Sequence, residues 1–293
     1  MKVKNSFGDK AFTFVAYVVV IGFALLCIMP FLYVLGYSLM PYNEYLENPI
    51  NFIPRTLDLG AYKSIFSYPT LYTGYKNTLF ITIVGTILNV TLLVISAYPL
   101  SKPHLKGRNL ILGMILFTML FSGGMIPRYY LVKNLNLINS LWAMILPGAI
   151  SAYNLILMKS FIENIPASLE ESAILDGANE IRVLFQIIVP LSLPAIAAFT
   201  VMCGVAHWND FFDAVIFTSR REVWPLMLVL REMVSEGGAG ALQQVTTDAT
   251  DVVTQTFTIQ MAMIVVTILP IVTIYPFAQK YFVTGLTLGG VKG

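Results

Sequence analysis

The most unusual polar cluster in this sequence is His207-Trp208-Asn209-Asp210, at the end of a long apolar segment and with Asp213 one helical turn further on. Trp208 offers an aromatic platform, and Asn209 and Asp210 offer amide and carboxylate partners for hydroxyl groups. A mostly apolar lining with a few polar groups suits a solute that has both ring faces and hydroxyls. Ionisable groups at membrane depth usually face a bundle interior or a water-filled path. The run therefore predicts one wall of a path for a polar solute, although an interfacial tryptophan beside residues that end a helix would give the same pattern.

Other candidates for this path lie in neighbouring apolar segments. The paired glycines 123–124 interrupt a helix, and broken backbone at a membrane can present nearby side chains to a ligand. Arg128 and Tyr129 would then face the solute, and Arg128 could bind a uronic acid carboxylate through paired N–H bonds. The alternative is that Arg128 only anchors the helix end at the interface. Asn154, Tyr153 and Asn89 are further candidates, each of which could instead form an interhelical hydrogen bond.

A third polar stretch, residues 171–190, reads ESAILDGANEIRVLFQIIVP and separates two apolar segments. Ser168 and Glu171 have the S-x-x-E spacing of a capping box, so a short helix is expected to begin at Ser168. Gly177 can take the left-handed conformation that ends a helix, which places this helix at about 168–177. A helix of two turns persists only when something packs on it. We therefore expect a docking helix for a soluble partner, with its contacts at Glu170, Glu171, Ala173, Asp176 and Gly177.

These polar stretches belong to a chain that is apolar overall. Its 293 residues are 57% hydrophobic and 12% charged, with a mean hydropathy of +0.74, outside the range of soluble domains. About 20 apolar residues cross the hydrocarbon core as a helix, because backbone in lipid must satisfy its own hydrogen bonds. We predict an all-α membrane protein with a single transmembrane domain over residues 1–293. The six expected transmembrane helices cover residues 12–39, 77–100, 110–126, 141–158, 183–205 and 257–277.

Basic residues predict the orientation, because short basic loops stay in the cytoplasm. They flank the first span and fill the link between the second and third: Lys2, Lys4, Lys10, Lys102, Lys106 and Arg108. Both termini are therefore expected in the cytoplasm, as is the docking helix between the fourth and fifth spans. The two longest connections, 41–75 and 219–255, are expected outside. The tail after Phe282 is too rich in glycine for a firm helix.

The sequence contains no motif for catalysis. It has no G-x-x-x-x-G-K-[ST] phosphate cradle, no H-E-x-x-H and no C-x-x-C, and the spacing of its two histidines and two cysteines gives no metal site. A net charge of +2 without a dense basic face excludes a nucleic-acid partner. Energy for uphill transport would then come from another chain. The alternative is an ion-driven secondary transporter of a small polar solute, which would need inverted repeats and paired ionisable groups near the bilayer centre.

The run 171–190 resembles the cytoplasmic signature of permease subunits in bacterial ABC importers, E-A-A-x3-G-x9-I-x-L-P. The residues in register are Glu171, Ala173, Gly177, Ile187 and Pro190, while Ser172 and Val189 depart from the pattern. The segments GGMIPRYYLVKNLNLINSLWAMILPG, HWNDFF and YFVTGLTLGGVKG are similar to the carbohydrate-uptake branch, so the resemblance covers most of the chain. Within that branch it is most like maltose-type permeases and the second permeases of importers for alginate or pectin-derived oligosaccharides.

The resemblance implies the fold of a type I ABC importer permease in the bacterial inner membrane, with a cytoplasmic coupling helix between the fourth and fifth spans. It implies pairing with a second homologous permease and docking on two ATP-binding subunits. An extracytoplasmic solute-binding protein would deliver the substrate, an oligosaccharide that we expect to be acidic. ATP and Mg²⁺ would be bound by the partner ATPases, so this chain would hold no cofactor and would not itself be an enzyme.

Overall fold

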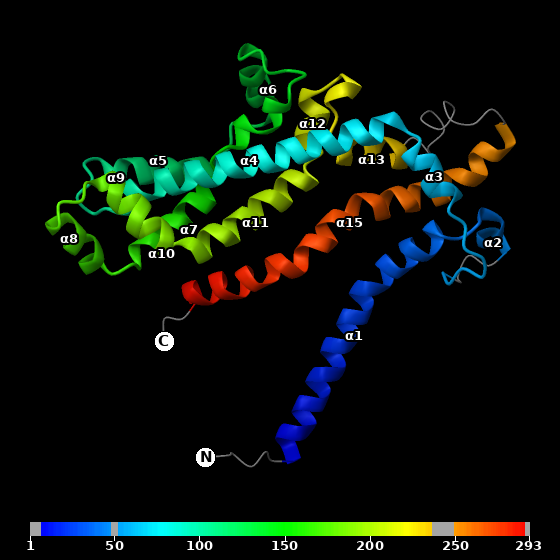
Figure 1. The fold of residues 1–293 in the computed structure, drawn as a ribbon, viewed down its shortest axis with the longest axis horizontal. Coiled ribbons are helices and arrows are strands. Elements are labelled where there is room, and N and C mark those ends of the chain that lie inside the picture. The colour runs from blue at the N-terminus through cyan, green and yellow to red at the C-terminus, as the bar shows by residue number, and fades with distance from the viewer. Residues whose placement is uncertain (1–6, 48–51, 236–248, 291–293) are drawn as a thin grey trace. The chain divides into compact units, whose positions relative to one another are not determined.

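The computed structural model describes residues 7–47, 52–235 and 249–290, and its regular elements there are all helices (Figure 1). The chain divides into two compact units. One unit comprises Met1–Pro69 and Leu230–Leu269, and the other comprises Thr70–Val229 and Pro270–Gly293. The all-α class predicted from composition is confirmed.

The first unit is built around the long apolar helix α1. It contains α1 (Phe7–Ser38), α2 (Tyr42–Glu47), α3 (Gly60–Phe66), the end of α13 (Leu226–Ser235) and the first part of α15 (Ala249–Gly290). The Tyr37 ring lies 5.1 Å from the Tyr45 ring and 5.8 Å from the Phe257 ring, measured between centroids. These aromatic contacts join the end of α1 to α2 and α15. The rest of α1 presents apolar side chains outward, as a helix in lipid or against another membrane subunit does.

The second unit contains the shorter helices that surround α4. In chain order they are α4 (Pro69–Ser101), α5 (Arg108–Leu120), α6 (Met125–Asn134), the 3₁₀ turns η1 (Leu141–Met144) and η2 (Leu146–Gly148), α7 (Ala152–Glu163), α8 (Ala167–Leu175), α9 (Glu180–Val183), the π-helical turn η3 (Leu184–Ile188), α10 (Val189–Leu191), α11 (Leu193–Asn209), α12 (Phe212–Phe217) and the 3₁₀ turn η4 (Arg221–Val223). The start of α13 and the end of α15 complete it. α4 runs beside α11 and α7 in this unit (Figure 1).

Within the described residues, three helices are long and apolar enough to cross a membrane unbroken: Lys10–Ser38, Pro69–Ser101 and Phe257–Pro276. Three further spans arise if each pair of helices that meets at a bend counts as one, which gives up to six. The pairs are Arg108–Leu120 with Met125–Asn134 (116°), Leu141–Gly148 with Ala152–Glu163 (51°), and Glu180–Leu191 with Leu193–Asn209 (77°). The predicted number of six agrees with this upper count. The prediction of continuous helices over 141–158 and 183–205 was wrong, whereas the break near the paired glycines 123–124 had been predicted.

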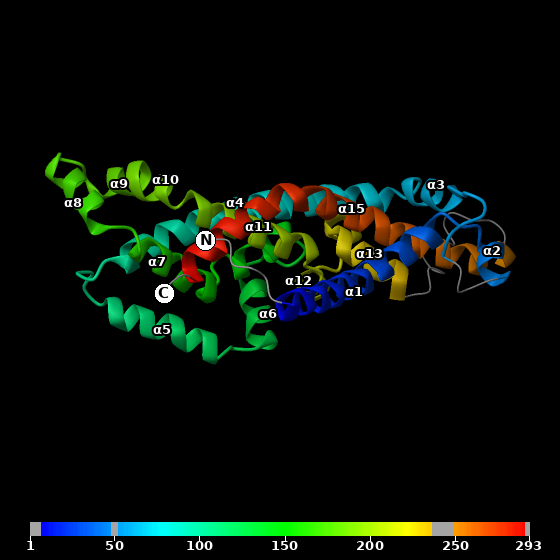
Figure 2. The ribbon, with the colours of Figure 1, turned by 90° about the horizontal axis from the view of Figure 1, so that it is seen from below.

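Local sequence explains each break. Gly124 takes a φ of 83°, which favours glycine, and α6 starts after it at the corner visible in Figure 2. Ser151 begins α7 afresh, because its hydroxyl accepts a hydrogen bond from the backbone N–H of Asn154 at 3.4 Å. Pro194 stands in the first turn of α11, where its missing N–H cannot continue the hydrogen bonds of α10. Only the glycine break had been expected.

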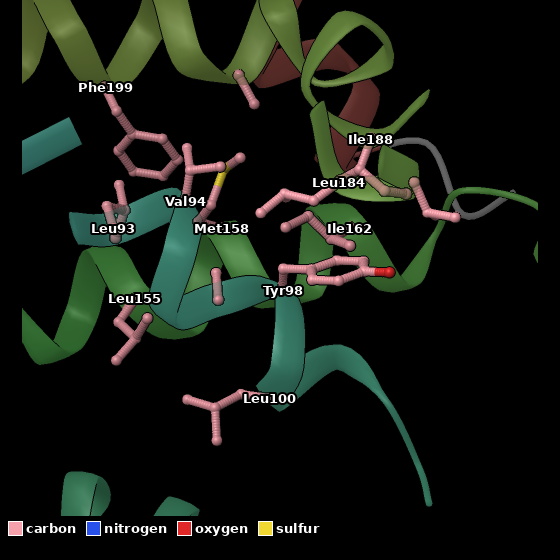
Figure 3. Packing of buried hydrophobic residues seen from close by; sticks show 13 residues of the cluster. Leu93, Val94, Tyr98, Leu100, Leu155, Met158, Ile162, Leu184, Ile188 and Phe199 are labelled. Carbon is pink, nitrogen blue, oxygen red and sulfur yellow. The ribbon is translucent and has the colours of Figure 1, made fainter. Parts of the chain in front are cut away.

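The main core of the second unit lies where α4 meets α7 and η3. Figure 3 shows Val94 and Tyr98 of α4 among Met158 and Ile162 of α7 and Leu184 of η3, all of them buried. Between helices in lipid such a core is stabilised by van der Waals packing of the side chains, because lipid tails are as apolar as the side chains themselves. Because α7 precedes α8 and η3 follows it soon after, this core attaches both flanks of α8 to α4.

The two expected outer connections are partly helical. Residues 48–51 and 236–248 lie outside the described residues, but α2 and α3 lie in the first connection, and η4 and α13 lie in the second. The backbone of α15 is helical through Gly290, so the expectation that the tail after Phe282 is not a firm helix was wrong. A long helix already formed upstream needs no new nucleus, so it can propagate through glycines that each cost about 1 kcal/mol.

Candidate functional site

The helix expected at 168–177 is present as α8, but it does not begin as predicted. Pro166 is its N-cap residue, with φ −57° and ψ 123°, and the Pro166 carbonyl accepts a hydrogen bond from the backbone N–H of Leu169 at 3.2 Å. Ser168 therefore lies inside the first turn, and its carbonyl accepts the Ser172 hydroxyl at 2.8 Å. The predicted capping box from Ser168 to Glu171 was wrong, because the fixed φ of proline already starts the helix two residues earlier.

The end of α8 confirms the role of Gly177. Its φ is 84°, and its N–H donates to the Ile174 carbonyl at 3.0 Å. The next N–H, of Ala178, donates to the Ala173 carbonyl at 2.9 Å. This pair of bonds is a Schellman motif, which requires a left-handed residue at the glycine position.

One face of α8 packs on the protein and the other faces away from it. Ala173 packs against the core, and the Glu170 carboxylate accepts a hydrogen bond from Lys102, with each of these two charged side chains only 14% exposed. Ile174 borders this packed face and is half exposed, and Leu175, on the opposite side of the helix, is 88% exposed. Figures 1 and 2 place α8 at one end of the second unit, next to α9.

The exposed face continues beyond α8. Glu171 and Asp176 are exposed on the helix, while Ile181 of α9 and Phe185 of η3 add apolar surface that is also exposed. Clustered apolar side chains with a charged rim are typical of a protein contact. We call this the α8 surface, meaning the exposed residues Leu169, Glu171, Ile174, Leu175, Asp176, Ile181 and Phe185. Of the five predicted contact residues, Glu170 and Ala173 are the two that the structure turns toward the protein itself.

The predicted path residues at the end of α11 are tied into the fold. Trp208 is 6% exposed and meets the Tyr75 ring edge to face at 6.3 Å. The Asn209 amide donates to the Val205 carbonyl at 3.0 Å, and Asp210 accepts a hydrogen bond from the backbone N–H of Asp213 at 3.2 Å. Burial raises the pKa of Asp210 above its ordinary value, as does the nearby charge of Asp213. Asn209 and Asp210 thus bond to backbone at the end of one helix and the start of the next.

Arg128 and Tyr129 of α6 join the same region through α12. The Arg128 guanidinium donates two hydrogen bonds to the Asp213 carboxylate, at 2.8 and 2.6 Å, and lies 5.5 Å from the Phe217 ring centroid. The Tyr129 ring stacks on the Phe217 ring, with the centroids 6.5 Å apart and an angle of 14° between the ring planes. Sequence reasoning named Asp213 but missed its pairing with Arg128. The two residues belong to different helices, so their pairing produces no i, i+3 or i, i+4 pattern in the sequence that could have predicted it.

A cavity of about 560 Å³ borders this ion pair. It is lined by Ser122, Gly123, Gly124, Met125, Pro127, Arg128, Leu131, Phe212, Ile216 and Phe217. The Arg128 side chain is still 38% exposed there, so the guanidinium borders the space while it binds Asp213. Asn154, also predicted to line the path, is not among the residues that line this cavity. It lies in the first turn of α7, where its backbone N–H donates to the Ser151 hydroxyl.

A polar contact in the middle of the unit joins α4 to α11. The Asn89 amide lies 3.2 Å from His207 Nε2, which confirms the interhelical bond considered for Asn89. The backbone at Gly85 passes so close to this imidazole that a Cβ there would lie 2.6 Å from Nε2. A second cavity, of about 360 Å³, lies beside this crossing and is bordered by Trp208. The buried hydroxyls of Thr82 and Thr86 have no hydrogen-bond partner in the described structure.

Comparison with known proteins gives one family and several relatives. Residues 2–287 match the family described as "Binding-protein-dependent transport system inner membrane component". The polygalacturonan/rhamnogalacturonan transport system permease protein YtcP of Bacillus subtilis (strain 168) is 40% identical over 287 residues, which cover 97% of this chain and 99% of that protein. Protein LplC of the same organism is 43% identical over 272 residues, which cover 93% and 92%.

A solved structure is similar over nearly the whole chain. It is a chain in the crystal structure of a bacterial ABC transporter involved in the import of the acidic polysaccharide alginate. The TM-score is 0.85 with 32% sequence identity, and the match covers 96% of this chain and 100% of that chain.

Proposed function

This chain belongs to the binding-protein-dependent transport system inner membrane component family, and from that premise we propose how it works in an importer. It is the membrane-spanning permease of an ATP-driven importer for sugars or oligosaccharides. A second homologous permease completes the path, two ATP-binding subunits hydrolyse ATP with Mg²⁺, and an extracytoplasmic binding protein delivers the solute. Membership of this family removes the ion-driven secondary transporter as an alternative.

We propose that the α8 surface is the contact with an ATP-binding subunit. The observation that carries this proposal is the exposure of Leu175 and Ile174 beside Glu171 at the end of the unit, on a helix that the protein holds by its opposite face. An apolar centre with a charged rim is the usual anatomy of a protein interface. This assignment places α8 and both termini in the cytoplasm of a bacterium, with the chain in the inner membrane.

We propose further that the substrate is an acidic oligosaccharide, from alginate or pectin. The similar transporter of known structure imports the acidic polysaccharide alginate, and YtcP is named for polygalacturonan, a polymer of uronic acids. The candidate path comprises Trp208, Asn209, Asp210, Arg128, Tyr129 and Asn154. In it, Arg128 uses two of its five N–H donors on Asp213 and borders the cavity with the rest of its fork. A carboxylate of the substrate would meet the Arg128 guanidinium, whose charge Asp213 already partly neutralises. The substrate would therefore bind weakly enough to be released again.

The test replaces the two residues that define the contact face and the end of α8. Glu171→Ala with Gly177→Asp should leave the protein inserted but abolish copurification with the ATP-binding subunits, or uncouple ATP hydrolysis from transport. The physical reason is that the rim charge is lost and the left-handed position becomes strained by about 1–2 kcal/mol.

Gly107→Asp is the matched control, because Gly107 has φ 80° with open space around it, as Gly177 has. It introduces the same charge and the same backbone strain in the link before α5, at a residue that is not part of the α8 surface. Unaltered assembly and coupling in the Glu171/Gly177 double variant would refute the assignment of the α8 surface. A loss of assembly in Gly107→Asp as well would mean that strain alone explains the effect.

A further inference from the structure

The cytoplasmic end of α4 binds both helices that flank Gly177. Lys102, directly after α4, donates to the Glu170 carboxylate on α8. Four residues earlier, the Tyr98 hydroxyl donates to the Glu180 carboxylate on α9 at 2.7 Å. The Lys102 ammonium also lies 4.5 Å from the Tyr98 ring centroid, so the two side chains form a cation–π contact. One end of one helix therefore contacts α8 and α9 through two acidic residues.

We propose that α4 and α8 move as one body during transport, and that Lys102 is the positioning residue that joins them. This inference rests on the proposed function of the α8 surface. A movement of the ATP-binding subunits that displaces α8 would be transmitted to α4 through the Lys102–Glu170 ion pair and the Tyr98–Glu180 hydrogen bond.

Burial makes this ion pair different from an ordinary surface pair. Exposed pairs contribute little because water and salt screen them. Lys102 and Glu170 are each 14% exposed, and the pair lies against the Tyr98 ring, which is itself in the buried core. Removing Lys102 would leave the Glu170 carboxylate shielded from water without its partner, which favours turning that carboxylate outward and away from α4.

α4 also has the connections needed to carry this movement to the candidate path. In its middle, Asn89 contacts His207, the residue next to Trp208. Near its other end, the Asn77 amide donates to the carbonyls of Glu222 and Trp224 at 2.8 and 3.0 Å. Because α4 is one unbroken helix from Pro69 to Ser101, a displacement of its end would be passed along the helix to these contacts.

The first experiment uses the whole importer in proteoliposomes with its binding protein, and measures oligosaccharide transported per ATP hydrolysed. Lys102→Gln should still copurify with the ATP-binding subunits, but this ratio should fall by about fivefold or more, the range of ordinary coupling between sites. Lys102→Glu with Glu170→Lys should restore the ratio, because the pair is remade with its charges exchanged. Lys159→Gln is the matched control, since Lys159 pairs with Glu163 inside the single helix α7 at 2.7 Å and should leave the ratio unchanged.

The second experiment joins the two positions covalently. Lys102→Cys with Glu170→Cys, in a chain whose Cys27 and Cys203 are replaced by alanine, should be poorly coupled before treatment and regain coupling after reaction with a short bis-maleimide cross-linker. This arm also decides the matter if Lys102→Gln fails to assemble.

Full coupling in Lys102→Gln, or coupling that stays low or is abolished after cross-linking, would overturn the inference. Those results would leave the proposed function intact as long as the variants still copurify with the ATP-binding subunits. Failure of the unaltered chain to copurify with them would instead defeat the proposed function. Restored coupling by both charge exchange and cross-linking is the expected result.

Discussion

Gly85→Ala tests whether α4 and α11 cross as closely as the structure indicates. A Cβ at position 85 would lie 2.6, 2.8 and 2.9 Å from Nε2, Cε1 and Cδ2 of His207. Non-bonded carbon atoms prefer about 3.5–4.0 Å, so the imidazole would have to move by roughly 1 Å. Either the two helices separate, or His207 turns and gives up its contact with Asn89. Overpacking of this kind costs about 1–3 kcal/mol, and the interhelical hydrogen bond adds about 0.6 kcal/mol on average.

The measurement is thermal unfolding of the purified complex in detergent, where this cost should lower the midpoint by several degrees. Gly204→Ala is the matched control on the facing helix, because its Cβ would meet Thr86 Oγ1 at 3.6 Å, an ordinary contact. Combining Gly85→Ala with His207→Ala removes the clash, so the double variant should be more stable than the sum of the two single effects. A Gly85→Ala protein as stable as the Gly204→Ala protein would refute the close crossing.

Two further predictions concern polar contacts elsewhere in the chain. Arg128→Lys keeps the positive charge but loses the paired hydrogen bonds to the Asp213 carboxylate. Because Arg128 is partly exposed, we expect the free energy of unfolding to fall by only about 1 kcal/mol in the same assay. An unchanged midpoint would show that the two-bond geometry contributes nothing to stability. The backbone N–H of Arg55 lowers the pKa of Glu44 below its ordinary value of 4.5, so this contact is present above pH 4.5 and is lost as the pH falls through the lowered pKa. Protection of the Arg55 amide from hydrogen exchange, corrected for intrinsic rates, should fall over that range and be absent throughout in Glu44→Ala; equal protection in both proteins would contradict it.

Several features were determined by the sequence alone, because they depend on composition or on neighbouring residues. Long apolar runs fix the membrane class, since lipid leaves the backbone no solvent to bond with. Gly177 fixes the end of α8, since only a residue that tolerates a positive φ completes the Schellman motif. The paired glycines at 123–124 mark the corner between α5 and α6 for a similar local reason.

Local rules failed where two local signals competed. The capping-box spacing of Ser168 and Glu171 was present, but Pro166 starts the helix earlier, so the serine is no longer at the cap. Hydropathy also predicted unbroken helices where Ser151 and Pro194 interrupt them, because an average over about 20 residues is insensitive to a single cap or proline.

The partners of the charged residues were decided only by the tertiary structure. Arg128 and Asp213 are 85 residues apart, and Lys102 and Glu170 are 68 residues apart. Nothing in the spacing of either pair distinguishes an arginine at a membrane interface from one bound to an aspartate, or a docking carboxylate from one that holds its helix in place. A side chain's partner depends on which helices the core brings together, and that packing is a property of the whole chain.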